Sequence, residues 1–191
     1  LLCPASARHA EWVDRVARPG QLLLIEKPFA GSLAEARRMI AISESRCCQL
    51  AINWPLAWSE TIRTAYEMCV EQQVIGDLIG FNYYGGNRGP LWHTFDKIEI
   101  TADEVAKQKP NSWFYQRNAG GGSLLDYLGY GATLGSWFLQ GREPIDITTV
   151  VDRPQGLEVD EHSISVCRYD FGLSRMETRW GTFTDPWTHR T

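Results

Sequence analysis

The pattern of hydrophobic and polar positions is clearest over residues 120–140, where it predicts a helix. Three glycines open this stretch, and at about 100° per residue the apolar positions that follow fall on one stripe. The stripe consists of Leu124, Leu128, Ala132, Gly135 and Leu139, and the opposite side of Asp126, Tyr130, Thr133 and Trp137. Because Asp126 is the only charged residue between Arg117 and Arg142, we expect other elements to cover both sides, with the apolar stripe facing a sheet.

Asp126 is the position in this helix that most needs a partner. A lone carboxylate inside a covered helix is costly unless a cation or hydrogen-bond donors meet it. Two interpretations stay open. Either backbone amides at the helix start satisfy a structural Asp126, or Asp126 belongs to a functional site with Tyr130, its neighbour one turn later.

The first 52 residues show the pattern of a parallel α/β unit. Ser6 can cap a helix over about 7–17, which a Pro-Gly pair ends. The continuous apolar run 22–25 is typical of a parallel strand covered on both faces. Ser32 opens a capping box for a second helix, and a second strand is predicted over 48–52. This order predicts part of a doubly wound parallel sheet.

After residue 53 the pattern changes. A helix is predicted over about 59–73, with strands over 78–84 and 145–151. The runs 162–169 and 173–180 alternate around a short turn and predict an antiparallel hairpin. The helix is expected to bury one side, made up of Trp58, Ile62, Ala65 and Cys69. The second half is therefore predicted to be a mixed or antiparallel sheet with the 120–140 helix against it.

Residues 85–119 are punctuated by glycine and proline and hold several aromatic residues. A loop of this length inside a compact domain is more often functional than idle. Within it, we predict that Trp92 and His93 contact a substrate.

Composition and charge exclude several classes of partner. The chain has 191 residues, 43% hydrophobic and 22% charged, with a formal net charge of −4. This charge argues against nucleic acid or an anionic membrane as the main partner, and no apolar run reaches the ~18 residues of a membrane span. The 5 cysteines form no Cys-x-x-Cys pair and indicate reduced thiols in a cytoplasmic protein.

Standard metal and nucleotide motifs are absent from the sequence. The histidines are scattered, so we predict no metal site. The run Gly129–Gly135 resembles a dinucleotide fingerprint, but its last spacing is one residue too long and it lies within a predicted helix. Both ends look like cuts within a longer protein, so the sequence does not test for an export signal.

Two stretches, far apart and in the same order, match the motifs of one known family. One is Leu23-Leu-Ile-Glu26-Lys27-Pro28, and the other is Gly120-Gly-Gly-Ser-Leu-Leu-Asp126-Tyr-Leu-Gly-Tyr130. They resemble the Glu-Lys-Pro motif and the Gly-Gly-Gly-x-Leu-x-Asp motif of the glucose–fructose oxidoreductase / inositol dehydrogenase / rhizopine catabolism (Gfo/Idh/MocA) family. Weaker matches lie at Cys3-Pro4, Gly76-Asp77-Leu78 and Trp113.

This resemblance implies an α/β fold in two parts. Residues 1–52 would be the C-terminal portion of a Rossmann-type parallel sheet, and residues 53–191 an α+β substrate domain with an open, largely antiparallel sheet. It also implies NAD or NADP as cofactor and a homo-oligomeric protein. The implied function is hydride transfer between NAD(P) and a hydroxyl or carbonyl of a sugar, cyclitol or similar polyol. Two alternatives stay open: an NAD-using lyase or glycosidase on the same scaffold, or a non-catalytic relative that binds a sugar or a partner.

Roles follow from the resemblance residue by residue. Lys27 matches the lysine that meets the nicotinamide ribose and the substrate, and Asp126 matches the aspartate that holds the substrate. Tyr130 occupies the position of the acid/base histidine, which is a departure from the family pattern. Phe114 and Trp54 are further departures, since both stand where the family commonly has Arg. The implied cofactor contacts are Pro4, His9, Glu26, Lys27, Pro28 and Trp113.

The chemistry of Tyr130 can be stated in advance. Oxidation of an alcohol requires a base for the hydroxyl proton while hydride leaves the carbon. Tyrosine is a poor base at pH 7, with a free pKa near ~10. A nearby ammonium group favours the phenolate, so we expect Lys27 to lie close to Asp126 and Tyr130 and to lower the pKa of the phenol.

Overall fold

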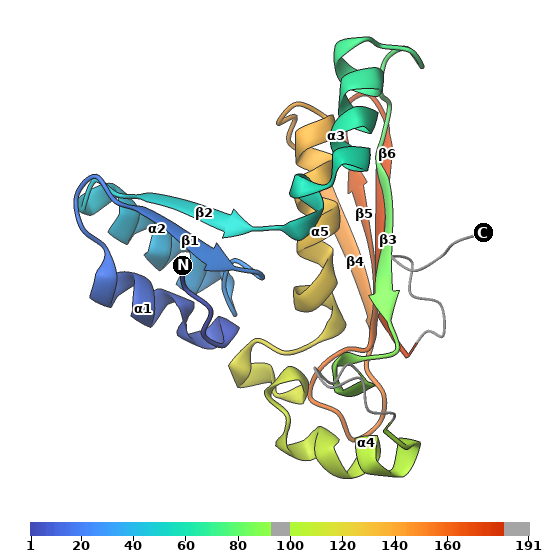
Figure 1. The fold of residues 1–191 in the computed structure, drawn as a ribbon. Helices are drawn as coiled ribbons and strands as arrows, with labels where there is room; N and C mark the ends of the chain where they lie inside the picture. The colour runs from blue at the N-terminus through green and yellow to red at the C-terminus, as the bar shows by residue number, and fades with distance from the viewer. Residues whose placement is uncertain (93–99, 182–191) are drawn as a thin grey trace.

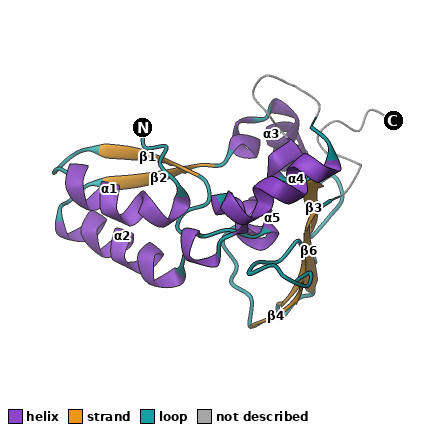
Figure 2. Ribbon diagram, turned by 90° about the horizontal axis from the view of Figure 1, so that it is seen from below, coloured by secondary structure: helices purple, strands orange, loops and turns teal. Residues whose placement is uncertain are grey.

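The structure is a computed structural model that describes residues 1–92 and 100–181. A pair of strands near the N-terminus forms one sheet, and four later strands form a second (Figure 1). Both views place helix α5 (Ser123–Phe138) between the two sheets (Figure 2). No helix among the described residues combines the length and the apolar character that a membrane crossing requires.

The first sheet confirms the predicted α/β unit. Strands β1 (Leu22–Glu26) and β2 (Gln49–Asn53) run parallel, with α1 (His9–Val16) before β1 and α2 (Leu33–Ser45) connecting the two strands. The helices and strands enclose a hydrophobic core that includes Ala10, Val13, Ala17, Leu23, Ile25 and Met39.

The expectation that β1 is covered on both faces is wrong for this chain. Leu23 and Ile25 are buried towards the helices, whereas Leu22 is exposed. Successive side chains of a strand point to opposite faces. Both helices pack on the face of Leu23 and Ile25, and no helix among the described residues covers Leu22.

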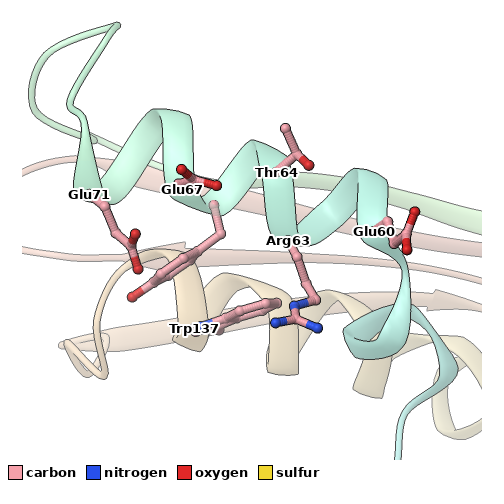
Figure 3. Close-up of a pocket in the computed structure, with 7 residues that line it drawn as sticks. Glu60, Arg63, Thr64, Glu67, Glu71 and Trp137 are labelled. Carbon is pink, nitrogen blue, oxygen red and sulfur yellow. The ribbon is translucent and has the colours of Figure 1, made fainter.

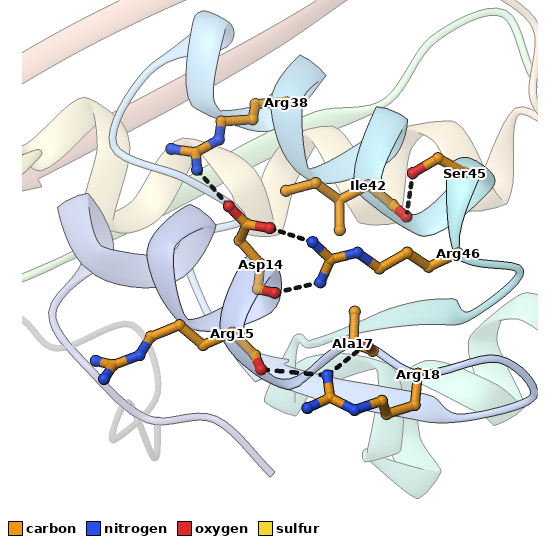
Figure 4. A network of polar contacts seen from close by, with 8 residues as sticks. All are labelled: Asp14, Arg15, Ala17, Arg18, Arg38, Ile42, Ser45 and Arg46. Atoms are coloured by element: carbon orange, nitrogen blue, oxygen red, sulfur yellow. Dashed lines mark hydrogen bonds and ion pairs between the residues drawn. The ribbon is translucent and has the colours of Figure 1, made fainter.

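Helix α2 is fixed both at its start and along its side. The predicted cap is present, since the hydroxyl oxygen of Ser32 accepts a hydrogen bond from the Glu35 amide at 3.2 Å. The carboxylate of Asp14 on α1 accepts hydrogen bonds from Arg38, at 2.7 Å, and from Arg46 (Figure 4). The hydrogen bond from Arg38 is the main cause that holds the pKa of Asp14 below its usual value. This network ties α1 to α2.

The second sheet is mixed, as the sequence predicts. Its strand order is β3-β6-β5-β4. Strand β3 (Asn82–Asn87) is parallel to β6 (Leu173–Trp180), while β5 (His162–Arg168) is antiparallel to both β6 and β4 (Asp146–Asp152). The predicted hairpin is the β5–β6 pair.

The helix predicted after residue 58 is present but lies at the surface. It consists of α3 (Glu60–Tyr66) and a continuing π-helical turn (Glu67–Glu71), and neither contains a buried residue. Trp58, expected in the core, is exposed. Tyr66 of this helix contacts two rings of α5: it stacks on Trp137 with 4.6 Å between ring centroids and lies edge-on to Phe138 at 5.5 Å.

The segment 85–119 is more ordered than a loop. It contains α4 (Ala102–Gln108), which begins with a complete capping box between Thr101 and Glu104. The sequence signal for this helix is the Thr-x-x-Glu spacing, which the glycine and proline content of the segment obscures.

Helix α5 packs on the second sheet through a side that only partly coincides with the predicted one. Its buried positions include Tyr127, Gly131, Leu134 and Phe138. A Cβ atom at Gly131 would come within 2.6 Å of the Tyr83 ring, so the glycine allows close approach to β3. Of the predicted apolar stripe, Gly135 and Leu139 are buried on the side of the sheet. Leu124, Leu128 and Ala132 instead line a shallow cavity with Pro28 and Trp54. The stripe therefore meets the sheet mainly at its C-terminal end, and the closest approach depends on glycine.

The start of α5 is held by Asp160. Its carboxylate accepts hydrogen bonds from the Ser123 hydroxyl at 2.6 Å and from the Leu124 amide at 2.9 Å. An acidic group at a helix N-terminus is favourable because it satisfies unpaired amides. The structural role considered for Asp126 thus belongs to Asp160.

Candidate active site

The carboxyl ends of β1 and β2 form a polar edge. Glu26 ends β1, and its carboxylate accepts hydrogen bonds from the Asn53 side chain at 2.7 Å and from the Lys27 amide at 3.2 Å. A cis peptide bond joins Lys27 to Pro28. Open parallel sheets bind ligands at this edge, and Lys27 projects from it.

Lys27 reaches α5, although 99 positions separate it from Asp126. The ammonium group forms an ion pair with the Asp126 carboxylate and donates a hydrogen bond to the Asp126 carbonyl at 3.2 Å. The two side chains are 23% and 13% exposed. A pair this sheltered interacts more strongly than a surface pair and remains reachable by a ligand.

The second oxygen of Asp126 is also engaged. The indole N–H of Trp180, the last residue of β6, donates to it at 3.1 Å. This contact could not be predicted from the sequence, because an inward-facing tryptophan in an alternating strand is typical of a core residue. Both carboxylate oxygens of Asp126 thus have protein partners.

Tyr130 lies beside this ion pair. The Lys27 ammonium is 5.5 Å from the Tyr130 ring centroid and 5.7 Å from that of Tyr127. Trp54 packs edge-on against Tyr130, with 5.1 Å between ring centroids and an interplanar angle of 70°. The three residues expected at one site, Lys27, Asp126 and Tyr130, therefore lie together, while their catalytic roles stay a prediction.

The expected effect of Lys27 on the phenol is wrong. Burial, followed by the negative charges of Asp126 and Glu26, raises the pKa of Tyr130 to about 12. Lys27 does not offset this because its charge is paired with Asp126. Tyr130 therefore keeps its proton at neutral pH.

A second tyrosine of this site was not anticipated. The side-chain amide of Asn87 donates a hydrogen bond to the Tyr127 hydroxyl. The side-chain oxygen of Asn87 accepts a hydrogen bond from the Gly89 backbone amide at 2.7 Å. This arrangement fixes the side-chain amide of Asn87 and, through it, the Tyr127 ring beside the Lys27 ammonium. Adjacent Tyr83 is buried at the same face, and burial raises its pKa above the usual value.

The predicted cofactor contacts are not equally accessible. His9 is only 1% exposed, and its ring nitrogens lie 3.1 Å from the Phe29 carbonyl and 3.2 Å from the Pro4 carbonyl. A side chain so enclosed cannot touch a ligand without moving, and the cofactor contact predicted for His9 stays a prediction. His9 ties the Pro4 segment to the loop that follows Lys27.

The aromatic residues predicted from 85–119 have partners within the segment or next to it. Trp113 stacks on Phe114 with 3.9 Å between ring centroids. The Arg88 guanidinium lies over the Trp92 ring at 4.2 Å. His93 lies outside the described residues, so its predicted substrate contact stays a prediction.

A groove of about 660 Å³ lies away from this cluster, between α3 and the end of α5 (Figure 3). It is lined by Glu60, Arg63, Thr64, Tyr66, Glu67, Glu71 and Trp137. Three carboxylates against one guanidinium do not suit the phosphates of a nucleotide. Within residues 1–92 and 100–181, no group of three His, Cys, Asp or Glu side chains could hold a metal ion.

Comparisons with known proteins agree with the architecture. No protein-family model matches the sequence. Two curated relatives are named dTDP-3,4-didehydro-2,6-dideoxy-alpha-D-glucose 3-reductase. The one from Actinomadura kijaniata is 29% identical over 119 residues, which are 62% of this chain and 30% of the relative. The one from Streptomyces violaceoruber is 29% identical over 133 residues, 70% of this chain and 33% of the relative. The matched region thus spans about a third of these relatives.

Solved structures cover nearly the whole chain. Aldose-aldose oxidoreductase from Caulobacter crescentus has a TM-score of 0.73 at 20% identity, covering 93% of this chain and 49% of that one. GenD2 from gentamicin A biosynthesis, solved with NAD, has a TM-score of 0.71 at 19% identity, covering 95% and 47%. For myo-inositol 2-dehydrogenase from Lactobacillus plantarum the TM-score is 0.70 at 15% identity, covering 94% and 51%. The chain has the fold of these Gfo/Idh/MocA-type oxidoreductases, as its motifs implied, and spans about half their length.

Proposed function

We propose that the gene product to which this chain belongs is an NAD(P)-dependent oxidoreductase that reduces a carbonyl group of a sugar or a similar polyol-derived ketone. The observation that supports this most directly is that Lys27, which follows strand β1, meets Asp126 and Tyr130 of helix α5. The direction of reaction is supported by the curated relatives, both named as 3-reductases of a dTDP-linked didehydro sugar.

The protonation state of Tyr130 fits reduction. A carbonyl that receives hydride develops negative charge on oxygen and needs a proton. A phenol whose pKa is raised to about 12 carries that proton at neutral pH and can give it to the stronger base. Lys27 would hold the same oxygen by a charge-assisted hydrogen bond, while Asp126 keeps the ammonium in place.

The polar edge of the first sheet fits a nicotinamide cofactor, which would supply the hydride when bound. The ends of β1 and β2 lie side by side there. The edge offers the Lys27 ammonium as a hydrogen-bond donor and the Glu26 carboxylate as an acceptor, and ribose hydroxyls can bond to both. Glu26, Lys27 and Pro28 would hold the cofactor, with Pro4 beside them. On this proposal, residues 1–52 are the C-terminal portion of the cofactor domain and residues 53–191 belong to the substrate domain.

The test is an absorbance assay of the full-length gene product with NADH or NADPH and a panel of ketosugars, including dTDP-linked ones. The expected result is stoichiometric oxidation of the cofactor together with formation of the alcohol. Elimination or glycoside cleavage without net cofactor oxidation would overturn the proposal in favour of a lyase or glycosidase. Binding of the sugar with no turnover of either kind would overturn it in favour of a non-catalytic relative.

A further inference from the structure

We propose that Trp180 is a positioning residue that sets the orientation of the Asp126 carboxylate, and through it the place of the Lys27 ammonium beside Tyr130. The inference rests on the proposed function for its catalytic consequence. The indole N–H of Trp180 takes one oxygen of Asp126 at 3.1 Å, and Lys27 takes the other.

Trp180 is itself held rigidly. It is 2% exposed, and as the last residue of β6 it pairs with Asn87 of β3. Its backbone amide donates to the Glu161 carbonyl at 2.7 Å. Its indole packs against Tyr115, with 5.2 Å between ring centroids, and edge-on against Phe114 at 6.4 Å. An indole enclosed on these sides cannot turn its N–H away from Asp126.

The carboxylate of Asp126 needs such a donor. Rotation about the last torsion of an aspartate is broad and only weakly restricted. A fixed N–H on one oxygen removes that freedom and leaves the other oxygen aimed at Lys27. Lys27 also donates a hydrogen bond to the Asp126 carbonyl at 3.2 Å. Since the backbone carbonyl is fixed by the helix, the direction of the carboxylate decides where the ammonium lies around it and therefore relative to Tyr130.

Trp12 offers a matched control in the same chain. Its indole nitrogen is also buried, but it has no hydrogen-bond partner among the described residues. Replacing either tryptophan by 3-benzothienylalanine keeps both rings and substitutes sulfur for the N–H. Only at position 180 does the exchange remove a hydrogen bond.

Both replacements are made in the full-length gene product, and ketosugar reduction is measured. At position 180 the turnover number should fall about tenfold or more, the range expected for a lost hydrogen bond to a charged group, with the KM for NAD(P)H unchanged. At position 12 both should stay as in the wild type. Equal effects at the two positions, or an unchanged turnover number at position 180, would overturn the proposal.

The indole N–H signal of Trp180 in the NMR spectrum gives a readout that needs no activity. It is identified as the signal missing from Trp180→Phe, and it should shift more than any other indole signal in Asp126→Asn. Lys27→Met, which changes the partner of the other oxygen, should move the same signal if Asp126→Asn does not fold. A signal unmoved by either variant would refute the positioning. A moved signal in a protein without oxidoreductase activity would refute the proposed function alone.

Discussion

Two clusters in this protein combine the same three groups, a lysine, a carboxylate and a tyrosine, yet only one is placed to act on a ligand. In the first, Lys27 pairs with Asp126 and lies 5.5 Å from the Tyr130 ring centroid. In the second, Lys109 pairs with Glu161 at 2.7 Å and lies 5.0 Å from the Tyr115 ring centroid. Ion-pair geometry and lysine exposure hardly separate them.

The difference lies in what each cluster joins. Lys27 directly follows β1 of the first sheet and meets α5, which packs on the second sheet, so its cluster joins the two parts of the molecule. Lys109 and Glu161 both belong to the region around the second sheet, and Tyr115 beneath them is buried against Trp180. The Lys109 cluster therefore supports the wall from which Trp180 reaches Asp126. The same chemistry can thus be a site or its support, depending on which elements it connects.

Removal of each lysine should separate the clusters most strongly. In the full-length protein, Lys27→Met should lower the turnover number by about 10³-fold, because both the substrate-oxygen contact and the balance of charge at Asp126 are lost. Lys109→Met should leave it within about threefold and cost about 1 kcal/mol of unfolding free energy or less, as for other partly exposed ion pairs. Steady-state kinetics and urea unfolding check both. Equal losses of activity would remove the distinction between the clusters.

The two tyrosines should differ next. Tyr130→Phe should lower the turnover number about 10²-fold, since the proton donor is gone while the ring remains. Tyr115→Phe keeps the aromatic wall and should change activity little. Neither substitution should alter the KM for NAD(P)H, so the difference between them should lie in the turnover number. A Tyr130→Phe enzyme with normal turnover would show that the proton comes from elsewhere.

Alkaline pH should produce the smallest but most specific difference. Tyr130 has its pKa raised from 10.0 to about 12, so the unfolded chain loses the phenol proton first as the pH rises. The stability linked to Tyr130 is therefore fully present below about pH 10 and is lost as the pH rises towards 12. The loss should be smaller in Tyr130→Phe, measured by urea unfolding at each pH.

Different neighbouring charges act on the phenols of Tyr130 and Tyr115, and a titration at alkaline pH can distinguish them. Burial first and Asp126 second raise the pKa of Tyr130, whereas burial first and Glu161 second raise that of Tyr115. Ultraviolet titration should show Asp126→Asn lowering the pKa of Tyr130 but not that of Tyr115, and Glu161→Gln lowering that of Tyr115 but not that of Tyr130. A common response to either variant would mean that the clusters are electrostatically one.

The sequence predicts elements better than the directions in which they pack. The β1–α2–β2 unit and the β5–β6 hairpin could be predicted from the hydrophobic periodicity of the sequence and from the capping residue of the helix. The side of α5 that packs on the sheet could not be predicted in the same way. Hydrophobicity alone points to its leucines, whereas the close approach of the helix to β3 requires Gly131 against Tyr83. Contacts between distant strands and helices leave no local period, and so Trp180 and Asn87 could not be found in advance.

The candidate site shows the same limit. The motifs bring Lys27, Asp126 and Tyr130 to notice, but the charge state of the phenol depends on which partner Lys27 takes. Two oppositely charged neighbours within one site predict opposite pKa shifts until their distances are known. The charge state of the Tyr130 phenol could therefore not be inferred from the sequence.

The most direct test of the central claim is a crystal structure of the full-length protein with NAD(P)⁺ and the alcohol product of its reaction. The account predicts that the product oxygen lies about 2.6–3.2 Å from the Tyr130 hydroxyl and also within hydrogen-bond distance of the Lys27 ammonium, with the Trp180 contact to Asp126 retained. A product bound elsewhere, with the Lys27–Asp126 pair closed and Tyr130 out of reach, would contradict it.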